Sequence, residues 1–417
     1  MKFSKKSILI ALVYFLIFSP KAFGEDVKAF FKNGKIDGNV RNYFQTRGFE
    51  TQPGSSAVSA GGKLVFDSGS FHGFGARLGF YTANGFGLKN DGQPEFNGAL
   101  AVEGINVLGE AFLEYSNLDM VIRAGRQKIS TPFINPSDAF VIPFMVNGVS
   151  ISNTHFKNLS LHAMHIVNIR NRQSDEFENA GEFATKRLGI LSTDTSGTSI
   201  FGVTWEANNL KAQVWEYYLF DLFNLFYLQV DYSLPVNESS IQPFLSIQFA
   251  REDETGDALL GEVGSTILGG KLGVVKEATT LSFSLNYVPQ NSDSFRNGGI
   301  LAPFSFATDP LFTNSQMQGL ATQGTSQIGF VYKATLTHQF TSQFKAWVSH
   351  TRFDLPSNVG GVDSNETDVD MTYRFGGVFK GLSVRNRFAI TSSDRSNENI
   401  WENRFQIQYS FSFSPFR

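Results

Sequence analysis

Strict alternation of polar and apolar residues at the end of the chain constrains the fold more than any other feature. From Arg404 to Phe413, each odd position carries a large apolar side chain and each even position a polar one. A period of two places these two kinds of side chain on opposite faces of a β-strand. The apolar face therefore contacts either a protein core or membrane hydrocarbon, and this segment alone does not decide between them.

Composition narrows the choice. The chain has 43 phenylalanines and no cysteine, which excludes disulfides and thiolate metal sites. Its mean hydropathy of -0.13 is too low for a bundle of membrane helices. Alternating strands hide membrane hydrophobicity, because each apolar residue is averaged with a polar neighbour. A membrane protein built from strands is compatible with both observations.

The N-terminus has the features of a secretory signal. Three lysines within the first six residues precede an apolar run from Ile8 to Phe18, and small residues follow at Ala22 and Gly24. This pattern predicts a signal peptide over residues 1–24 and a mature domain over 25–417. The alternative is a membrane-anchoring helix. Removal of residues 1–24 leaves 31 basic and 38 acidic residues, a net charge of -7, which does not suggest a nucleic-acid binder.

Alternation and turn signals predict 18 strands in the mature sequence. They are 36–47, 57–68, 73–83, 106–115, 118–127, 147–153, 159–168, 199–207, 210–220, 223–233, 241–251, 264–275, 279–288, 326–339, 342–353, 367–376, 381–391 and 402–413.

The length of each linker depends on whether the strand before it has an odd or an even number in the chain. Those after even-numbered strands are short, and four share a polar residue, then Asn or Gly, then Leu: 116–118, 157–159, 208–210 and 380–382. Those after odd-numbered strands are mostly long, with a turn near Asp221 as an exception: 84–105, 128–146, 169–198, 252–263, 289–325, 354–366 and 392–401. Short turns on one rim and long loops on the other are typical of outer-membrane barrels.

Closure follows from the membrane environment. Lipid offers no hydrogen-bond partners, so a sheet with open edges is not tolerated there. The last strand, 402–413, must then pair with the first, 36–47. The sequence thus predicts an all-β fold, a transmembrane antiparallel β-barrel of 18 strands.

Charged residues are expected inside such a barrel, because Arg or Lys on the lipid face at mid-bilayer costs about 2–4 kcal/mol. Strand alternation places two glutamates inside, Glu110 and Glu114. It also places these arginines inside: Arg41, Arg77, Arg123, Arg374, Arg385, Arg387 and Arg404. All of these arginines except Arg123 fall on one arc after closure. They form either a basic wall that guides solutes or a set of ion pairs that merely fills the lumen.

The third long linker, 128–146, is unusual for a solvated loop. It holds three prolines and many apolar side chains, so it needs a surface to pack against. We expect it to fold into the barrel and narrow the lumen, with Ser130, Asn135, Ser137 and Asp138 as the polar residues of the constriction. The alternative is a loop that lies on the outer rim.

Three stretches of the mature chain carry a family resemblance: residues 34–43, residues 69–79, and the block from Arg123 through the proline-rich loop to His165. In these, and in its overall pattern, the mature chain resembles the OprD-type family of outer-membrane porins. The resemblance implies an 18-stranded barrel with an inward third loop, a basic ladder along the lumen and assembly as a homotrimer. The arginines on the predicted wall would take the ladder role. Barrel porins commonly end on an aromatic residue, whereas here residues 414–417 follow Phe413. Either Phe416 takes that role or the last strand ends differently.

These features predict a bacterial outer-membrane porin for small hydrophilic solutes, favouring those that carry carboxylates. Outer-membrane lipid and lipopolysaccharide are the expected surroundings. The alternative is a structural or adhesive surface protein that acts through long loops such as 169–198 and 289–325. No catalytic constellation, cofactor motif or metal-ligand spacing is present, so an enzyme is not expected. Two acidic runs, 252–257 and 363–370, are expected in external loops, either solvated or bound to divalent cations.

Overall fold

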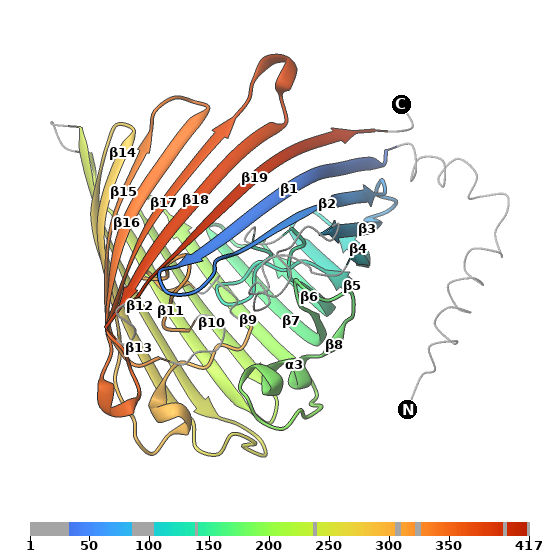
Figure 1. The fold of residues 1–417 in the computed structure, drawn as a ribbon. Helices are drawn as coiled ribbons and strands as arrows, with labels where there is room; N and C mark the ends of the chain where they lie inside the picture. The colour runs from blue at the N-terminus through green and yellow to red at the C-terminus, as the bar shows by residue number, and fades with distance from the viewer. Residues whose placement is uncertain are drawn as a thin grey trace, which may run out of the picture.

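The computed structural model describes residues 33–85, 104–137, 141–236, 240–304, 310–321, 327–394 and 398–414. The predicted signal peptide lies outside these residues. The described chain is a single antiparallel sheet closed into a barrel (Figure 1). Its strands are β1 Lys35–Phe49, β2 Ser55–Asp67, β3 Phe74–Asn84, β4 Ile105–Ser116, β5 Met120–Gln127, β6 Met145–Asn153, β7 Leu159–Arg170, β8 Glu178–Asn179, β9 Thr198–Ala207, β10 Leu210–Leu219, β11 Phe223–Ser233, β12 Ile241–Glu254, β13 Gly264–Lys276, β14 Thr279–Val288, β15 Gly329–Gln339, β16 Phe344–Asp354, β17 Ser364–Arg374, β18 Leu382–Ser393 and β19 Asn399–Phe413.

The barrel closes where the sequence predicted. β19 pairs with β1 along nearly its whole length, with Ile36 opposite Phe413 and Arg41 opposite Gln408. The two-residue β8 pairs only with the end of β7, so 18 of the strands in the described chain form the barrel wall. The predicted strand number and the predicted closing pair are both confirmed.

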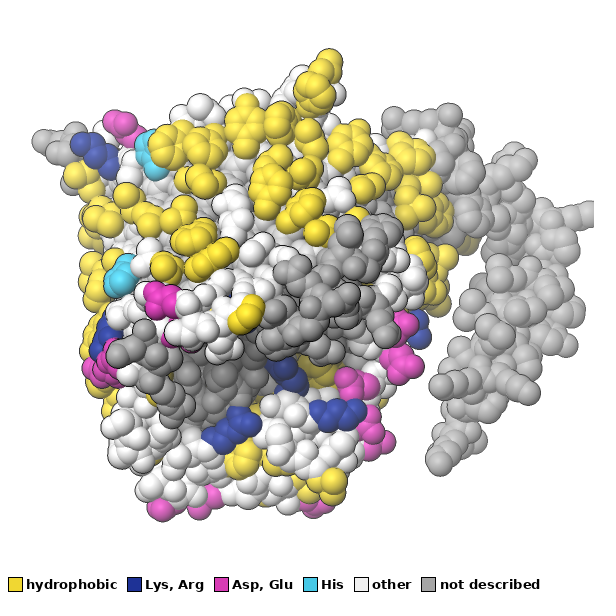
Figure 2. Space-filling view, in the orientation of Figure 1, with side chains coloured by type: hydrophobic (Ala, Val, Ile, Leu, Met, Phe, Trp, Pro, Cys, Tyr) yellow, Lys and Arg dark blue, Asp and Glu magenta, His cyan; other side chains and the backbone are white. Residues whose placement is uncertain are grey.

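The two faces of the wall carry different side chains. On β1, Val40 and Phe44 point outward and are exposed, whereas Tyr43 and Gln45 point inward and are buried. On β19, Glu402, Arg404 and Gln406 are buried inside. In the view of Figure 2, hydrophobic side chains cover much of the upper surface, and charged ones lie mainly lower down. The outer belt is thus apolar, as a bilayer requires.

The short turns use the expected residues in two ways. Asn158, Asn208 and Gly381 have positive φ values of 64°, 52° and 100°, as tight hairpins require. Asn117 differs: its side-chain Oδ1 accepts hydrogen bonds from the backbone N–H of Asp119 (3.1 Å) and Met120 (2.9 Å). The same Asn-Leu pattern therefore makes a turn by backbone conformation at one place and by side-chain capping at another.

The opposite rim carries the long linkers but is less uniform than predicted. Asp221, with φ 63°, forms the expected tight turn between β10 and β11. The linkers 50–54 and 394–398 are also short, because β1, β18 and β19 extend further than the alternation indicated. On this rim the linker 171–197 contains α3, Ala180–Arg187, and shorter 3-10 turns occur at Phe295–Gly298 and Ser357–Val359. A further 3-10 turn, Gly377–Phe379, lies on the short-turn rim between β17 and β18. No helix in the described parts of the chain is long and apolar enough to cross a membrane.

Candidate functional site

Two adjoining cavities lie along the interior face of β15–β19 and β1. The smaller has a volume of about 200 Å³ and the larger about 350 Å³. They share the side chains of Trp347, Asp370 and Arg385. The smaller is also lined by Asn314, Ser315, Gln316, Lys333, Asp368, Arg387 and Arg404. The larger is also lined by Arg41, Lys345, Thr372, Arg374, Ser383, Gln406 and Gln408.

Five of the six arginines predicted to share one wall line these cavities: Arg41, Arg374, Arg385, Arg387 and Arg404. Strand register brings them together, because Arg387 lies directly opposite Arg404 on β19 and opposite Asp370 on β17. Two lysines, Lys333 and Lys345, join the same lining.

The guanidinium groups in these cavities have different partners. Arg385 makes a two-pronged contact with Asp370, with nitrogen–oxygen distances of 2.6 and 3.0 Å. Arg404 donates to the buried carboxylate of Glu402 at 2.5 Å, and Arg47 reaches the other oxygen of the same carboxylate at 2.5 Å. Arg41 donates to the neutral amide oxygen of Gln408 at 2.8 Å. Arg385 and Arg404 are thus ion-paired, and Arg41 bonds to a neutral amide oxygen.

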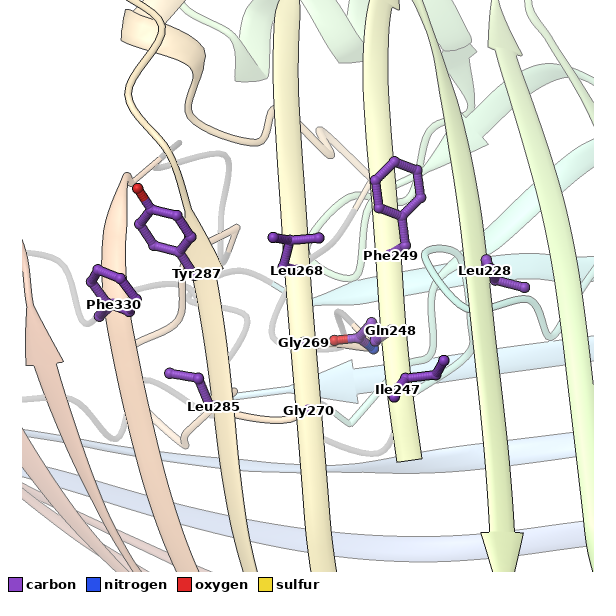
Figure 3. A pocket seen from close by; sticks show the side chains of 10 residues that line it. All are labelled: Leu228, Ile247, Gln248, Phe249, Leu268, Gly269, Gly270, Leu285, Tyr287 and Phe330. Atoms are coloured by element: carbon purple, nitrogen blue, oxygen red, sulfur yellow. The ribbon is translucent and has the colours of Figure 1, made fainter. Parts of the chain in front are cut away.

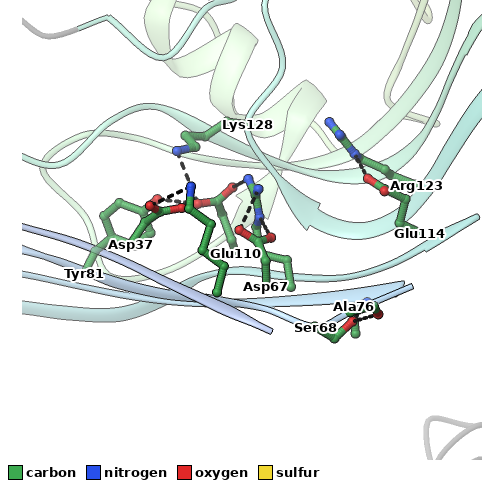
Figure 4. A network of polar contacts seen from close by, with 12 residues as sticks. Asp37, Asp67, Ser68, Ala76, Tyr81, Glu110, Glu114, Arg123 and Lys128 are labelled. Atoms are coloured by element: carbon green, nitrogen blue, oxygen red, sulfur yellow. Dashed lines mark hydrogen bonds and ion pairs between the residues drawn. The ribbon is translucent and has the colours of Figure 1, made fainter. Parts of the chain in front are cut away.

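Arg77 lines neither cavity and belongs to a separate acidic network (Figure 4). It pairs with Asp67 at 2.5 Å and with the buried Glu110 at 3.4 Å. Glu110 also contacts Lys128 at 3.3 Å and accepts a hydrogen bond from the Tyr81 hydroxyl. The geometry of Arg77 therefore agrees with the second alternative from the sequence, ion pairs that fill the lumen, and not with a basic wall that guides solutes.

Arg123 is likewise ion-paired, with Glu114 at 2.7 Å. The Phe112 ring lies between the two arginines of this region, with its centroid 5.5 Å from Arg77 and 5.3 Å from Arg123. Each of the two predicted interior glutamates therefore has an arginine partner on a neighbouring strand.

Asp257 and Asp363 lie in long linkers as expected, but most residues of the two acidic runs lie on strands. β17 starts at Ser364, so Glu366, Asp368 and Asp370 alternate along a strand and are buried on its interior face. β12 likewise continues to Glu254 and includes the buried Glu252. The prediction was wrong because polar residues on the interior face of a barrel strand resemble a solvated loop when their cationic neighbours are unknown. No group of three or more His, Asp or Glu able to hold a metal ion occurs among the described residues.

The proline-rich linker contacts two separate parts of the interior. The backbone N–H of Phe133 donates to the hydroxyl of Tyr217 on β10 at 3.1 Å, and the Phe133 ring lies edge-on to Tyr217 and to Tyr227 on β11. Further along, Ile142 belongs to a buried cluster that includes Tyr43 of β1. The linker is thus packed at both ends.

The polar residues of that linker are placed as follows. Ser130 is exposed, whereas Asn135 and Ser137 are half-buried. The Asn135 side chain accepts a hydrogen bond from the Ser137 N–H at 3.2 Å, and Ser137 has a positive φ of 44°. Asp138 lies outside the described residues.

The linker 289–328 contributes a segment that the sequence analysis missed. Residues 310–318 lie along the interior wall and bond to one strand after another: Pro310 to Gln248, Thr313 to Asn286, Asn314 to Lys333, Ser315 to Thr351, Gln316 to Arg404, Met317 to Glu366 and Gln318 to Ser364. The apolar side chains of Ile300, Leu301, Leu311 and Leu320 are buried. An excess of apolar residues singled out 128–146, but residues 310–318 are largely polar, so the same criterion does not find this segment.

Three long linkers meet at Phe183. Asn179 caps α3 by accepting a hydrogen bond from the Gly181 N–H at 2.7 Å, and this holds Phe183 in place. The Phe183 ring contacts Phe144 (5.9 Å between centroids) and Phe304 (6.0 Å). Segments from linkers 128–144, 171–197 and 289–328 thus share one apolar cluster with the barrel wall.

Comparison with known proteins shows which family this chain belongs to. Residues 28–413 match a family model described as outer membrane porin, OprD family. Porin D of Pseudomonas aeruginosa is 23% identical over 280 residues, which cover 64% of this chain and 61% of that relative.

Solved structures show the same fold at low sequence identity. OccAB3 of Acinetobacter baumannii superposes with a TM-score of 0.78 at 17% identity, covering 91% of this chain and all of that one. OccK9 of Pseudomonas aeruginosa gives 0.77 at 17% identity over 92% of this chain and all of its own. OpdK of the same organism, solved with vanillate, gives 0.74 at 16% identity over 92% of this chain and all of its own.

Proposed function

The chain belongs to the OprD family of outer membrane porins, and from this premise we propose that it forms a passive channel for small hydrophilic solutes that favours carboxylate-bearing molecules. The carrying observation is the excess of positive charge in the two adjoining cavities. The larger is lined by Arg41, Lys345, Arg374 and Arg385 against Asp370 as its one acidic residue. Such a lining attracts anions and raises their local concentration.

Segment 128–144 would narrow this channel. Its residue Phe133 is packed against interior tyrosines of β10 and β11, and its residue Ile142 belongs to a buried cluster with residues of β1 to β4 and β6. These contacts with the inner face of the wall support a constriction that includes Ser130, Asn135 and Ser137.

A carboxylate substrate is consistent with one relative. OpdK was solved with vanillate, a small aromatic carboxylate. The Trp347 ring lines both cavities, with the Lys333 Nζ 5.9 Å from its centroid, and offers an apolar surface beside a cation. Both groups suit an aromatic acid in this chain, through ring contact and charge pairing.

Flux of a matched pair of solutes tests the proposal. Liposomes containing the protein should take up vanillate several-fold faster than vanillyl alcohol, its neutral counterpart, because only vanillate carries the carboxylate. The double variant Arg41→Gln, Arg374→Gln should lower vanillate flux and leave the alcohol's flux unchanged. Lys157→Gln removes a charge at the short-turn rim and serves as the control, with no expected effect.

Planar-bilayer recording provides a second readout. The double variant should shift the reversal potential in a salt gradient toward cation preference, whereas Lys157→Gln should not. Stepwise conductance with an unchanged reversal potential would contradict the basic-wall proposal but leave the channel intact. Absence of stepwise conductance in the wild type would overturn the channel itself.

Other expectations are less well supported. Adhesion through 169–198 and 289–325 gains no support, since described parts of both linkers are packed into the apolar cluster around Phe183. Assembly as a homotrimer and the lack of enzymatic activity stay predictions.

A further inference from the structure

A hollow of about 430 Å³ lies on the outer surface of the barrel, across β11 to β15 (Figure 3). Its walls are outward-facing apolar side chains, among them Ile247, Phe249, Leu268 and Leu285. At one side the Tyr287 and Phe330 rings stack with centroids 4.0 Å apart and form a flat wall. The volume falls within the range of small-ligand pockets, about 300–1,000 Å³.

The hollow exists because β13 carries a glycine on its outward face. Gly270 lies opposite Ile247 on β12 and Leu285 on β14, so its missing side chain leaves a gap between two large neighbours. A Cβ atom added there would meet no other atom within 4 Å. Two residues along, Leu268 lies between Phe249 and Tyr287 and forms the next level of the wall.

Between this hollow and the long-linker rim, the outward face of β12 changes from apolar to charged side chains. On the outward face of β12, Arg251 follows Phe249 by two residues toward the long-linker rim, a rise of about 7 Å. The Arg251 guanidinium is partly exposed and contacts Asp253 and the Thr266 hydroxyl, the latter at 3.0 Å. Exposed ion pairs of this kind contribute little, about 0–1 kcal/mol, so a phosphate can compete for the guanidinium.

Because the hollow lies on the outer face of the barrel, the molecules available to fill it are those of the bilayer. It is continuous with the apolar outer belt, and an unfilled gap would forfeit dispersion contacts with every atom of its lining. A second protein copy would need roughly 1,200–2,000 Å² of complementary surface, far more than a hollow of this size presents. A slender hydrocarbon chain with an anionic head toward the long-linker rim fits both the groove and Arg251.

We propose that this hollow, the Gly270 groove, binds one acyl chain of a lipopolysaccharide molecule, with a phosphate of its headgroup beside Arg251. The long-linker rim faces the cell exterior in outer-membrane barrels, so the groove opens toward the external leaflet. The site depends on the family's membrane location and is independent of which solutes pass through the lumen.

Lipid retention tests the proposal. The full-length protein is purified from outer membranes in mild detergent, and bound lipopolysaccharide is counted by native mass spectrometry. The wild type should retain one molecule per chain. Gly270→Leu fills the groove and should reduce retention at least tenfold, and Arg251→Gln should reduce it several-fold. Ala346→Leu adds three carbon atoms, against four in Gly270→Leu, to the outward face of β16 away from the groove, and should retain lipid like the wild type.

Several outcomes would overturn it. Equal retention by Gly270→Leu and the wild type would exclude the groove, and equal loss in Ala346→Leu would show a nonspecific effect of bulk. A change in oligomer mass without loss of lipid would assign the face to contact between copies. Retention of phosphatidylglycerol in place of lipopolysaccharide, after incubation of the delipidated protein with each, would refute the named lipid. Single-channel conductance should be unchanged in all variants. Loss of lipid without loss of conductance would thus test the lipid site independently of the channel.

Discussion

The interior faces of β10–β13 and of β16–β1 are built by the same strand alternation but are filled differently. Inward side chains of the first region, such as Leu225 and Tyr227, are buried against the apolar cluster of linkers around Phe183. Those of the second, such as Arg385 and Glu402, lie among other charges and line or border cavities. The first region is a protein core and the second a polar wall; together they cover nine of the 18 wall strands, and we call them the apolar half and the polar half of this comparison.

The difference teaches which forces hold each half. The apolar half depends on close packing, because burial of hydrocarbon and loss of voids stabilise it. The polar half depends on the pairing of its charged side chains, because a buried charge is tolerated only when an opposite charge or a hydrogen-bonding group compensates it. Substitutions of similar size should therefore act through different mechanisms in the two halves.

The largest expected effect is a cavity in the apolar half. Leu225→Ala, at 2% exposure, should lower the free energy of unfolding by about 2–5 kcal/mol, because the space left cannot be refilled. Equilibrium unfolding by denaturant in detergent micelles measures it. Leu272→Ala is the control, since this leucine is 58% exposed on the outer face, where lipid or detergent fills the gap. Equal losses in both variants would refute the division into core and wall.

A somewhat smaller effect is expected from a broken ion pair in the polar half. Glu402→Gln keeps the size of the side chain but leaves Arg47 and Arg404 without their shared carboxylate, and should cost about 1–3 kcal/mol. The same unfolding experiment applies. Glu206→Gln, whose side chain is 68% exposed and 3.9 Å from Lys211, should change stability little. If Glu402→Gln and Glu206→Gln lower the free energy of unfolding equally, burial does not determine the strength of these ion pairs.

The contact between linker and wall should rank third. Thr351→Val removes the hydroxyl that bonds to Ser315 at 2.7 Å, where both groups are buried, and should cost about 1 kcal/mol. Because this bond holds residues 310–318 to the wall, open-channel current noise should also increase. Thr337→Val is the control, since Thr337 lies on the interior face of the neighbouring strand β15, nearer the short turns. Unchanged noise would mean that the other bonds of the segment suffice.

The smallest effect lies outside both halves, at the long-linker rim. Hydrogen bonds from the Thr51 hydroxyl (2.6 Å) and backbone N–H (2.8 Å) hold the pKa of the exposed Glu398 below its usual value. A lowered pKa means that the ionised form is favoured in the folded state. Its stabilisation is present above the ordinary glutamate pKa and is lost as pH falls through the lowered one.

Thr51→Val should therefore raise the pKa of Glu398 toward its ordinary value. Chemical shifts of selectively labelled glutamate carboxyls, followed with pH, would show it. Glu50→Gln alters a neighbouring acid and serves as the comparison. A pKa of Glu398 that is unchanged in Thr51→Val would assign the shift to other contacts.

Much of the barrel could be predicted because lipid imposes a simple rule. The alternation of Phe405, Ile407 and Tyr409 with Arg404, Gln406 and Gln408 determined the two faces of β19, and the ban on open edges determined its partner β1. The clustering of Arg385, Arg387 and Arg404 followed from register between neighbouring strands, which alternation nearly determines.

Other parts could not be predicted, because they depend on contacts far apart in sequence. Glu366 and Asp368 resemble loop residues until Met317 and Ser349 are placed beside them. The path of residues 310–318 depends on seven separate bonds to the wall, none marked by a local pattern. Gly270 is an ordinary strand glycine in the sequence, and only the register of β12 and β14 turns it into a groove.

The sequence by itself determined the closed barrel, its strand number, its two faces and the candidate cations, since each follows from a period of two in a medium without hydrogen-bond partners. The tertiary structure decided which cations are paired, which linkers fill the interior and where the outer surface is hollow. The physical reason is that backbone hydrogen bonding repeats locally along every strand, whereas charge pairing and close packing join residues that only the completed fold brings together.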